Sequence, residues 1–233
     1  MRALVERWAS IPETTNTAVS RYMMRIYLLM SAGIGLSAGA ATLVAQDGAL
    51  RGALFTQTGV TGLGWAIMLA PLLLVITISS GVSRISADRA RVLFVLYALL
   101  VGLSLGTLCY AATGESLATT FLAAAGAFLL LAIFGWVSGA DFSPFGIFAM
   151  LGILALVVLM ATNAAIGSQR LDILLSAAAI VLFSALTAFD VQRLKRLYLD
   201  GDVRTATVGA LTLYLDFVNM FLSLVRFSGG ARR

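Results

Sequence analysis

Long apolar runs separated by short polar segments make up most of the chain. A membrane-spanning helix needs about 20 mostly apolar residues, and seven runs reach or approach this length. They are 24–45, 60–82, 92–112, 117–137, 146–167, 171–191 and 206–226. The short connections between them make neighbouring helices antiparallel. The pattern therefore predicts an all-α integral membrane protein with seven transmembrane helices in one compact bundle.

The ends of the chain are more polar than the runs. Residues 1–22 are mixed and polar, and the apolar stretch after them is too long for the core of a cleavable signal peptide. We therefore expect a polar N-terminal tail at 1–22, a membrane domain at 23–228 and a short C-terminal tail at 229–233.

Two carboxylates interrupt the last two apolar runs. Asp190 and Asp216 lie where a charged side chain costs about 3 kcal/mol near the bilayer centre. They are 26 positions apart, and their midpoint, Val203, falls in the polar stretch 199–204. A turn at this stretch would bring the two carboxylates back to the same depth. The spacing predicts one shared site.

The last run also carries polar or small residues along one helix face. They recur at steps of four and three: Thr205, Gly209, Thr212, Asp216, Asn219, Ser223 and Arg226. A lipid-facing helix would not tolerate this stripe, so we expect the last helix to be central. The stripe could line a water-filled crevice or form a hydrogen-bonded seam between helices, and the sequence leaves both open.

Two carboxylates at one depth in a low-dielectric site do not both ionise freely, and they titrate as a unit. With one shared proton, Asp190 and Asp216 form a closed contact. Loss of that proton would push the helices apart or recruit a cation such as Ca²⁺, which prefers oxygen ligands. An arginine could hold the ionised pair, and Arg84 is the candidate latch. The alternatives are that Arg84 only flanks its helix and that Asp190 only pairs with Arg193.

Composition supports a membrane protein and excludes several function classes. The chain is 60% hydrophobic and 12% charged, whereas soluble domains contain about 25% charged residues. The net charge of +5 arises from Lys and Arg placed between apolar runs, which indicates membrane topology rather than nucleic-acid binding. The chain has no histidine, and its single cysteine, Cys109, cannot form an internal disulfide. We expect no cofactor and no enzymatic activity, because no metal, nucleophile or phosphate-loop motif occurs.

The basic residues also predict an orientation. Eleven fall on one side of the predicted spans and five on the other. The larger set comprises Arg2, Arg7, Arg21, Arg25, Arg84, Arg89, Arg91, Arg193, Lys195, Arg196 and Arg204. The positive-inside bias places this side, with the N-terminus, in the cytoplasm. Seven full spans would leave the C-terminus outside, whereas a re-entrant last helix would leave it inside.

Glycine and proline positions predict local features of the helices. The pairs Gly35/Gly39 and Gly102/Gly106 have the spacing that lets helices approach closely. Pro71 should kink the second span. Ser143 followed by Pro144 is typical of an N-cap and a first helical residue.

Several segments resemble one known family. The last helix, 210–229, closely resembles that of the Bax inhibitor-1 (transmembrane Bax inhibitor motif) family, and 188–195 resembles its sixth-helix ending. Residues 93–105 are similar to its third helix, and Asp141-Phe-Ser143 with Gly146 resembles its loop before helix five. The resemblance covers nearly the whole chain.

This resemblance implies a fold and a function. The fold would be three helical hairpins around a central seventh helix. The bacterial members that the chain resembles are pH-sensitive calcium leak channels of the inner membrane. Their two sensor aspartates correspond to Asp190 and Asp216, and their arginine latch corresponds to Arg84. The leading hypothesis is therefore a pH-gated leak for cations, expected to be Ca²⁺, with the lipid bilayer and calcium ions as partners.

Two other functions remain as alternatives. The protein could modulate a membrane-bound protease or a stress response through residues 1–22, as some bacterial relatives do. Two membrane aspartates also occur in intramembrane aspartyl proteases, which require a Tyr-Asp and a Gly-x-Gly-Asp pattern. Here Phe189 precedes Asp190, and Leu213-Tyr-Leu precedes Asp216, so we do not expect this enzyme.

Overall fold

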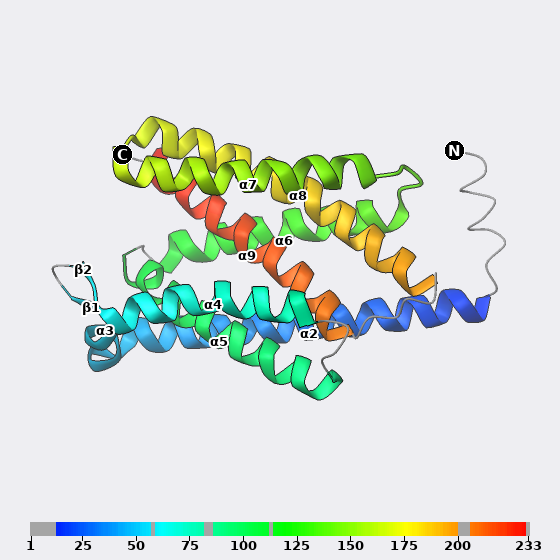
Figure 1. Cartoon of the computed structure of the whole chain (residues 1–233), viewed down its shortest axis with the longest axis horizontal. Coiled ribbons are helices and arrows are strands. Elements are labelled where there is room, and N and C mark those ends of the chain that lie inside the picture. The colour runs from blue at the N-terminus through cyan, green and yellow to red at the C-terminus, as the bar shows by residue number, and fades with distance from the viewer. Residues whose placement is uncertain (1–12, 57–58, 82–85, 112–113, 200–205, 232–233) are drawn as a thin grey trace. The chain divides into compact units, whose positions relative to one another are not determined.

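The computed structural model describes residues 13–56, 59–81, 86–111, 114–199 and 206–231, and these are almost entirely helical (Figure 1). In chain order the elements are α2 (Glu13–Gln46), α3 (Gly48–Leu54), β1 (Phe55–Thr56), β2 (Gly59–Val60), α4 (Gly62–Gly81), α5 (Ala87–Ala111), α6 (Gly114–Val137), α7 (Ser143–Ile166), α8 (Gln169–Leu199) and α9 (Ala206–Ala231).

Within the described residues, six helices are long and apolar enough to cross a membrane: α2, α5, α6, α7, α8 and α9. The prediction of an all-α membrane protein is confirmed, but the count of seven spans is not. The second predicted span corresponds to α4, which contains Pro71 and a shorter apolar run, Gly62–Val75.

Two boundaries differ from the sequence prediction. Helix α2 begins at Glu13, inside the segment 1–22 that we expected to be a polar tail. Helix α8 continues to Leu199, eight residues beyond the predicted end at 191. The apolar run marks only the hydrocarbon-facing part of a helix, and a helix can continue into the polar zone when its side chains find partners there.

The segment between α2 and α4 contains structure that hydropathy did not predict. Asp47 caps α3 by accepting hydrogen bonds from the N–H groups of Ala49 and Leu50. Strands β1 and β2 then pair antiparallel, with Phe55 opposite Val60. Two-residue strands are too short to give an alternating pattern.

The chain divides into two compact units. Unit 1 comprises Met1–Met24, Ala118–Arg204 and Leu215–Arg233, and unit 2 comprises Arg25–Leu117 and Thr205–Tyr214. Helix α9 thus contributes its first part to unit 2 and its second part to unit 1.

In unit 2, α5 packs closely on α2. A Cβ added at Gly102 would lie 2.5 Å from the carbonyl oxygen of Ser37, and one at Gly106 would lie 2.4 Å from Val44. The Ser37 hydroxyl donates to the carbonyl of Ala98 at 2.7 Å. It also lies 2.5 Å from the hydroxyl of Tyr214, which is fully buried. The predicted packing role of Gly102 and Gly106 is confirmed.

The corresponding prediction for Gly35 and Gly39 is wrong. No described atom lies within 4 Å of a Cβ built on either glycine. The face of α2 that packs carries Gly33 and Ser37 instead, and a Cβ on Gly33 would meet Phe94 and Tyr214. Small-residue spacing identifies a possible contact face but does not say which of two neighbouring faces is used.

In unit 1, α7 and α8 form a hairpin closed by a two-residue turn. Gly167 ends α7 in the left-handed conformation, with φ of 71°, and its N–H bonds to the carbonyl of Asn163. The Asn163 amide also exchanges two hydrogen bonds with the backbone of Ser168. Below the turn, the hairpin core is formed by Leu156, Leu175 and Ala179.

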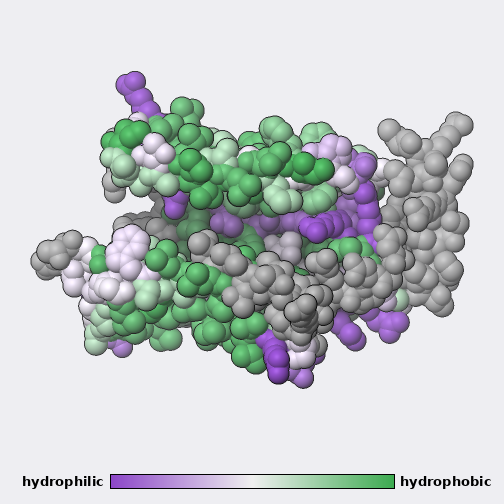
Figure 2. All heavy atoms as spheres, in the orientation of Figure 1, coloured by the Kyte–Doolittle hydropathy of each residue, from purple (hydrophilic) through white to green (hydrophobic). Residues whose placement is uncertain are grey.

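The surface of the helices is apolar, as expected for a protein solvated by lipid. Phe148 and Leu151 on α7 are 69% and 63% exposed. Figure 2 shows hydrophobic residues predominating over the visible face of α7. Exposing these apolar side chains to water would be unfavourable, whereas in a bilayer they contact acyl chains.

We predict opposite outcomes for two Gly→Ala substitutions. Gly102→Ala should destabilise the protein by about 1–3 kcal/mol, because the new methyl group would overlap the Ser37 backbone. Gly35→Ala should leave stability unchanged or raise it slightly, since alanine favours helix and the site is open. Thermal unfolding of the detergent-solubilised variants measures both. Equal midpoints for the two variants would contradict the packing described.

Candidate functional site: a buried carboxylate pair

Helices α8 and α9 each contribute one carboxylate to the same place in unit 1. Asp190 is 5% exposed and Asp216 is 2% exposed. Their side chains are close enough to act on each other electrostatically. The prediction that Asp190 and Asp216 share one site agrees with this proximity, and their equal depth in a bilayer stays a prediction.

The oxygen atoms of the pair differ in their partners. Oδ1 of Asp190 lies 3.8 Å from Nη1 of Arg193, whose side chain is half exposed. Oδ2 of Asp216 is fully buried and has no hydrogen-bond donor among the described residues. A buried oxygen without a donor is costly. A proton on Asp216 would lower this cost and would remove one of two like charges.

Small residues let the neighbouring helices approach α8 around Asp190. Gly135 of α6 lies against Ala188, and Gly146 of α7 lies against the ring of Phe189. The buried hydroxyl of Thr187 donates to the carbonyl of Phe183 in its own helix. Asp190 therefore sits in a tightly packed part of the unit.

The described part of the polar stripe is largely enclosed from Gly209 to Ser223, whereas Arg226 at its end is exposed. Of the α9 span 56% is buried, against 17% for the α6 and α7 spans. Three stripe residues donate to carbonyls of α9 itself: Thr212 to Val208, Asn219 to Leu215 and Ser223 to Asn219. These three side chains satisfy their donors within the helix rather than across a seam between helices.

Part of the stripe borders a cavity in unit 1. Asn219, Ser223 and Arg226 line a space of about 150 Å³ together with apolar residues of α7, α8 and α9. Of the other predicted site residues, Arg84 lies outside the described residues. Arg193, the alternative partner of Asp190, lies 3.8 Å from it, which is long for an ion pair.

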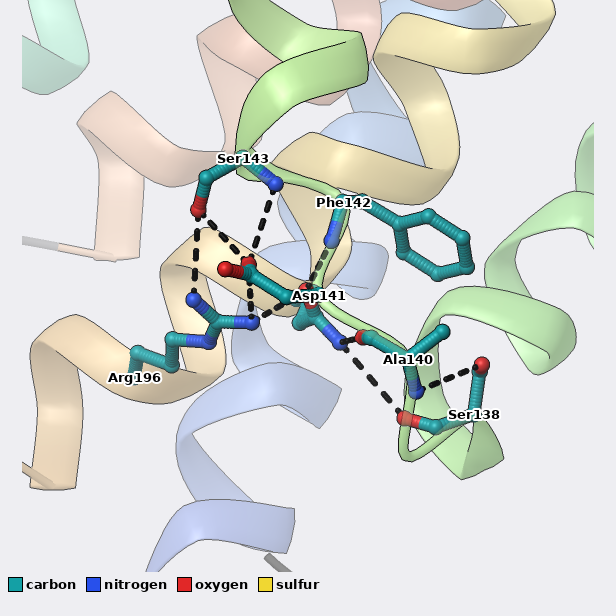
Figure 3. Close-up of polar contacts among 7 residues, drawn as sticks. Ser138, Ala140, Asp141, Phe142, Ser143 and Arg196 are labelled. Atoms are coloured by element: carbon teal, nitrogen blue, oxygen red, sulfur yellow. Dashed lines mark hydrogen bonds and ion pairs between the residues drawn. The ribbon is translucent and has the colours of Figure 1, made fainter. Parts of the chain in front are cut away.

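A polar clamp between α8 and the α6–α7 loop was not predicted from the sequence (Figure 3). Gln192 is buried, donates to the carbonyl of Ala140 at 2.6 Å and accepts from the N–H of Phe142 at 3.2 Å. Arg196 donates to Oδ1 of Asp141 at 3.0 Å and to the hydroxyl of Ser143 at 3.3 Å. We call Asp141, Ser143, Gln192 and Arg196 the loop clamp.

Helix α7 begins one residue earlier than the sequence predicts. Ser143 is the first helical residue rather than the N-cap, and Phe142 occupies the cap position without a side-chain hydrogen bond. Asp141 takes over the capping, because its Oδ1 accepts from the N–H of Ser143 at 3.1 Å and from its hydroxyl at 2.8 Å. A carboxylate at a helix N-terminus is favoured by the helix dipole.

These bonds hold Asp141 ionised. The backbone N–H and the hydroxyl of Ser143, and then Arg196, lower the pKa of Asp141 from 3.8 to about 2. Asp141 therefore does not change charge near neutral pH, and the loop clamp is not itself a sensor in that range. The sequence signal for the clamp was the lone acidic residue in the loop 138–145 opposite the basic segment 193–196.

Lys195 fixes the same end of α8 to α6. Its ammonium group donates to the carbonyl of Trp136 at 3.1 Å and lies 4.5 Å from the centre of the Trp136 ring. Tryptophan and lysine are common anchors at the membrane interface.

The site offers few ligands to a metal ion. Among the described residues, no group of three or more His, Cys, Asp or Glu side chains could hold one. Asp190 and Asp216 together supply at most four oxygens, whereas Ca²⁺ takes six to eight. Further ligands of a bound Ca²⁺ would have to be backbone carbonyls or waters.

Comparisons with known proteins place the chain in a family. The family model described as "Inhibitor of apoptosis-promoting Bax1" matches residues 19–233. An uncharacterised protein of Deinococcus radiodurans is 38% identical over 226 residues, with 95% of each chain covered. The inner membrane protein YbhL of Escherichia coli K12 is 34% identical over 224 residues, with 93% of this chain and 94% of YbhL covered. An uncharacterised protein of Caulobacter vibrioides is 32% identical over 230 residues, with 94% and 92% covered.

We predict that Asp141→Asn destabilises the protein in a pH-dependent way. The folded pKa lies below the ordinary value, so the stabilisation is complete above about pH 4 and is lost as pH falls through about 2. The difference between wild type and Asp141→Asn should thus be constant from about pH 5 to 8 and disappear near pH 2. Unfolding followed by tryptophan fluorescence measures it.

The matched control is Asp88→Asn. Asp88 pairs with Arg91 at 3.1 Å, but both side chains are well exposed, and such pairs contribute little. A destabilisation of Asp88→Asn equal to that of Asp141→Asn would show that the loop clamp has no special role.

Proposed function

Because the chain belongs to the Bax inhibitor-1 family, we propose that it is a pH-sensitive cation leak channel of a bacterial inner membrane, with Ca²⁺ as the expected permeant ion. The membrane location is supported by six apolar helices and by the similarity to the inner membrane protein YbhL. The proposed gate is the pair formed by Asp190 and Asp216.

The observation that carries this proposal is that two adjacent carboxyl groups are buried and that one of their oxygens has no hydrogen-bond donor among the described residues. Oδ2 of Asp216 has no hydrogen-bond donor among the described residues. The guanidinium of Arg193 lies 3.8 Å from Oδ1 of Asp190, and its side chain is half exposed. One partly solvated cation cannot offset two buried charges. The contact is therefore stable with one proton in the pair and unstable without it.

Loss of the proton would act mainly on the contact between α8 and α9. Near the pair, α8 and α9 are joined by one weak hydrogen bond, in which the Ser184 hydroxyl lies 3.9 Å from the sulfur of Met220. By contrast, Phe217 packs edge-to-face on Phe121 and Phe128 of α6, at 5.5 and 5.8 Å between ring centres. We infer that α9 remains packed on α6 and that the gap opens between α9 and α8.

The same geometry suits transient contact with a cation. Once ionised, the pair presents carboxylate oxygens that attract Ca²⁺, but too few to retain it. Weak binding favours a leak, since conduction requires that the ion leave as readily as it enters. Arg84 remains our candidate for the group that holds the ionised pair when no cation is present.

We further propose that α4 completes seven spans, arranged as three hairpins around α9, with the N-terminus in the cytoplasm. Support comes from α4 itself, a 20-residue apolar helix that packs on α5. The hydroxyl of Ser104 on α5 bonds to the carbonyl of Ile67 on α4 at 3.4 Å.

We predict that Asp216→Asn abolishes the pH dependence of Ca²⁺ flux. Asparagine keeps the shape of the side chain but cannot ionise, so the contact with Asp190 no longer responds to pH. The purified protein in liposomes, loaded with a calcium-sensitive dye, should show flux that changes between about pH 6 and 8 in the wild type. In Asp216→Asn the flux should be the same at both ends of that range.

Asp172→Asn is the matched control, because Asp172 lies in the first turn of the same helix as Asp190. It should keep the wild-type pH profile. A wild-type profile in Asp216→Asn would contradict the gate. No flux at any pH from folded protein would contradict the channel and favour a protein that modulates a membrane protease or a stress response.

A further inference from the structure

The cavity in unit 1 has one polar side and otherwise apolar walls. Its volume is about 150 Å³, and Leu156, Met160, Phe183 and Leu222 contribute to the apolar walls. The polar lining comes entirely from α9, through Asn219, Ser223 and Arg226. A cavity of this size lined by apolar residues can hold a group the size of benzene. It is therefore large enough for a segment of an acyl chain.

The cavity opens toward the lipid-facing surface of α7. Val157 lines it and is 60% exposed, and Leu154 and Val158, its neighbours on α7, are also exposed. In a bilayer this surface is covered by acyl chains, so a chain has direct access to the opening.

Arg226 places a cation beside this opening without an acidic partner. It is exposed and lies within the apolar span Ala206–Gly229. Its guanidinium contacts the sulfur of Met160 at 3.6 Å, and no carboxylate among the described residues lies within ion-pair distance. A cation in this position is unfavourable unless an anion reaches it, and the guanidinium fork matches the oxygens of a phosphate group.

We propose that this cavity binds one anionic phospholipid, with part of an acyl chain against the walls and the headgroup phosphate on Arg226. Asn219 and Ser223 add two further polar side chains to the α9 side of the lining. Arg226 repels cations, so the cavity does not serve as a vestibule for calcium. The site is independent of the leak proposed above.

Native mass spectrometry of the detergent-purified protein tests this site. The protein is titrated with phosphatidylglycerol and with phosphatidylcholine carrying the same acyl chains. Wild type should retain one phosphatidylglycerol in preference to phosphatidylcholine. Arg226→Gln should weaken phosphatidylglycerol binding about fivefold, the effect of one basic residue at a membrane surface, and weaken phosphatidylcholine binding less, because the choline ammonium group offsets the charge of its phosphate. Val157→Phe should weaken binding of both lipids, because the ring fills the opening.

Two control variants separate this site from general attraction. Arg170→Gln removes an exposed arginine of α8 that does not line the cavity, and Val158→Phe enlarges an exposed neighbour of Val157 that does not line it either. Both should bind lipid as wild type does. An equal loss in Arg170→Gln and Arg226→Gln would overturn the headgroup contact. Unchanged binding in Val157→Phe would overturn the cavity as the site, and equal retention of the two lipids by wild type would overturn both.

Discussion

The structure of unit 1 depends on the burial of two like-charged groups in an apolar helix bundle. Asp190 is 5% exposed and Asp216 is 2% exposed. Burying either side chain alone in its ionised form would be unfavourable without a hydrogen-bond donor or a cation beside it. Together they can share one proton, so each helix supplies the partner that the other needs. This sharing favours one register between α8 and α9, because a shift of one turn would separate the two carboxyl groups. In the proposed gate, the contact holds only while a proton is present, which would tie the packing of unit 1 to the pH of its surroundings.

The remainder of unit 1 supports α8 on either side of the pair. Gly135 and Gly146 let α6 and α7 approach Ala188 and Phe189. Just beyond Asp190, Gln192 holds the α6–α7 loop through its two amide atoms. Because the pKa of Asp141 is about 2, the loop clamp keeps its charge when the pair titrates. The end of α8 that carries the loop clamp thus lies next to the proposed gate, so we expect the proposed movement on the side of α8 that faces α9.

Hydropathy and spacing were sufficient to predict the features that depend on the bilayer and on helix periodicity. The all-α membrane class, six of the seven predicted spans among the described residues, the proximity of Asp190 and Asp216 and the burial of much of α9 follow from these rules. Features that depend on which atoms meet were missed. The loop clamp joins residues 50 or more positions apart, and β1 and β2 are too short to show a period. Gly35 has the same spacing pattern as Gly102 but faces open space, since a sequence motif does not specify which face of a helix is covered.

The most direct test of the central claim is infrared difference spectroscopy of the protonated carboxyl groups, with wild type compared with Asp216→Asn. If the pair shares a proton, wild type at about pH 6 should show a protonated carboxyl band that is absent from Asp216→Asn and disappears toward about pH 8. Its disappearance should coincide with the change in calcium flux. A wild-type spectrum with no such band anywhere in this range would show that both carboxylates are ionised in the closed contact, and would contradict the gate.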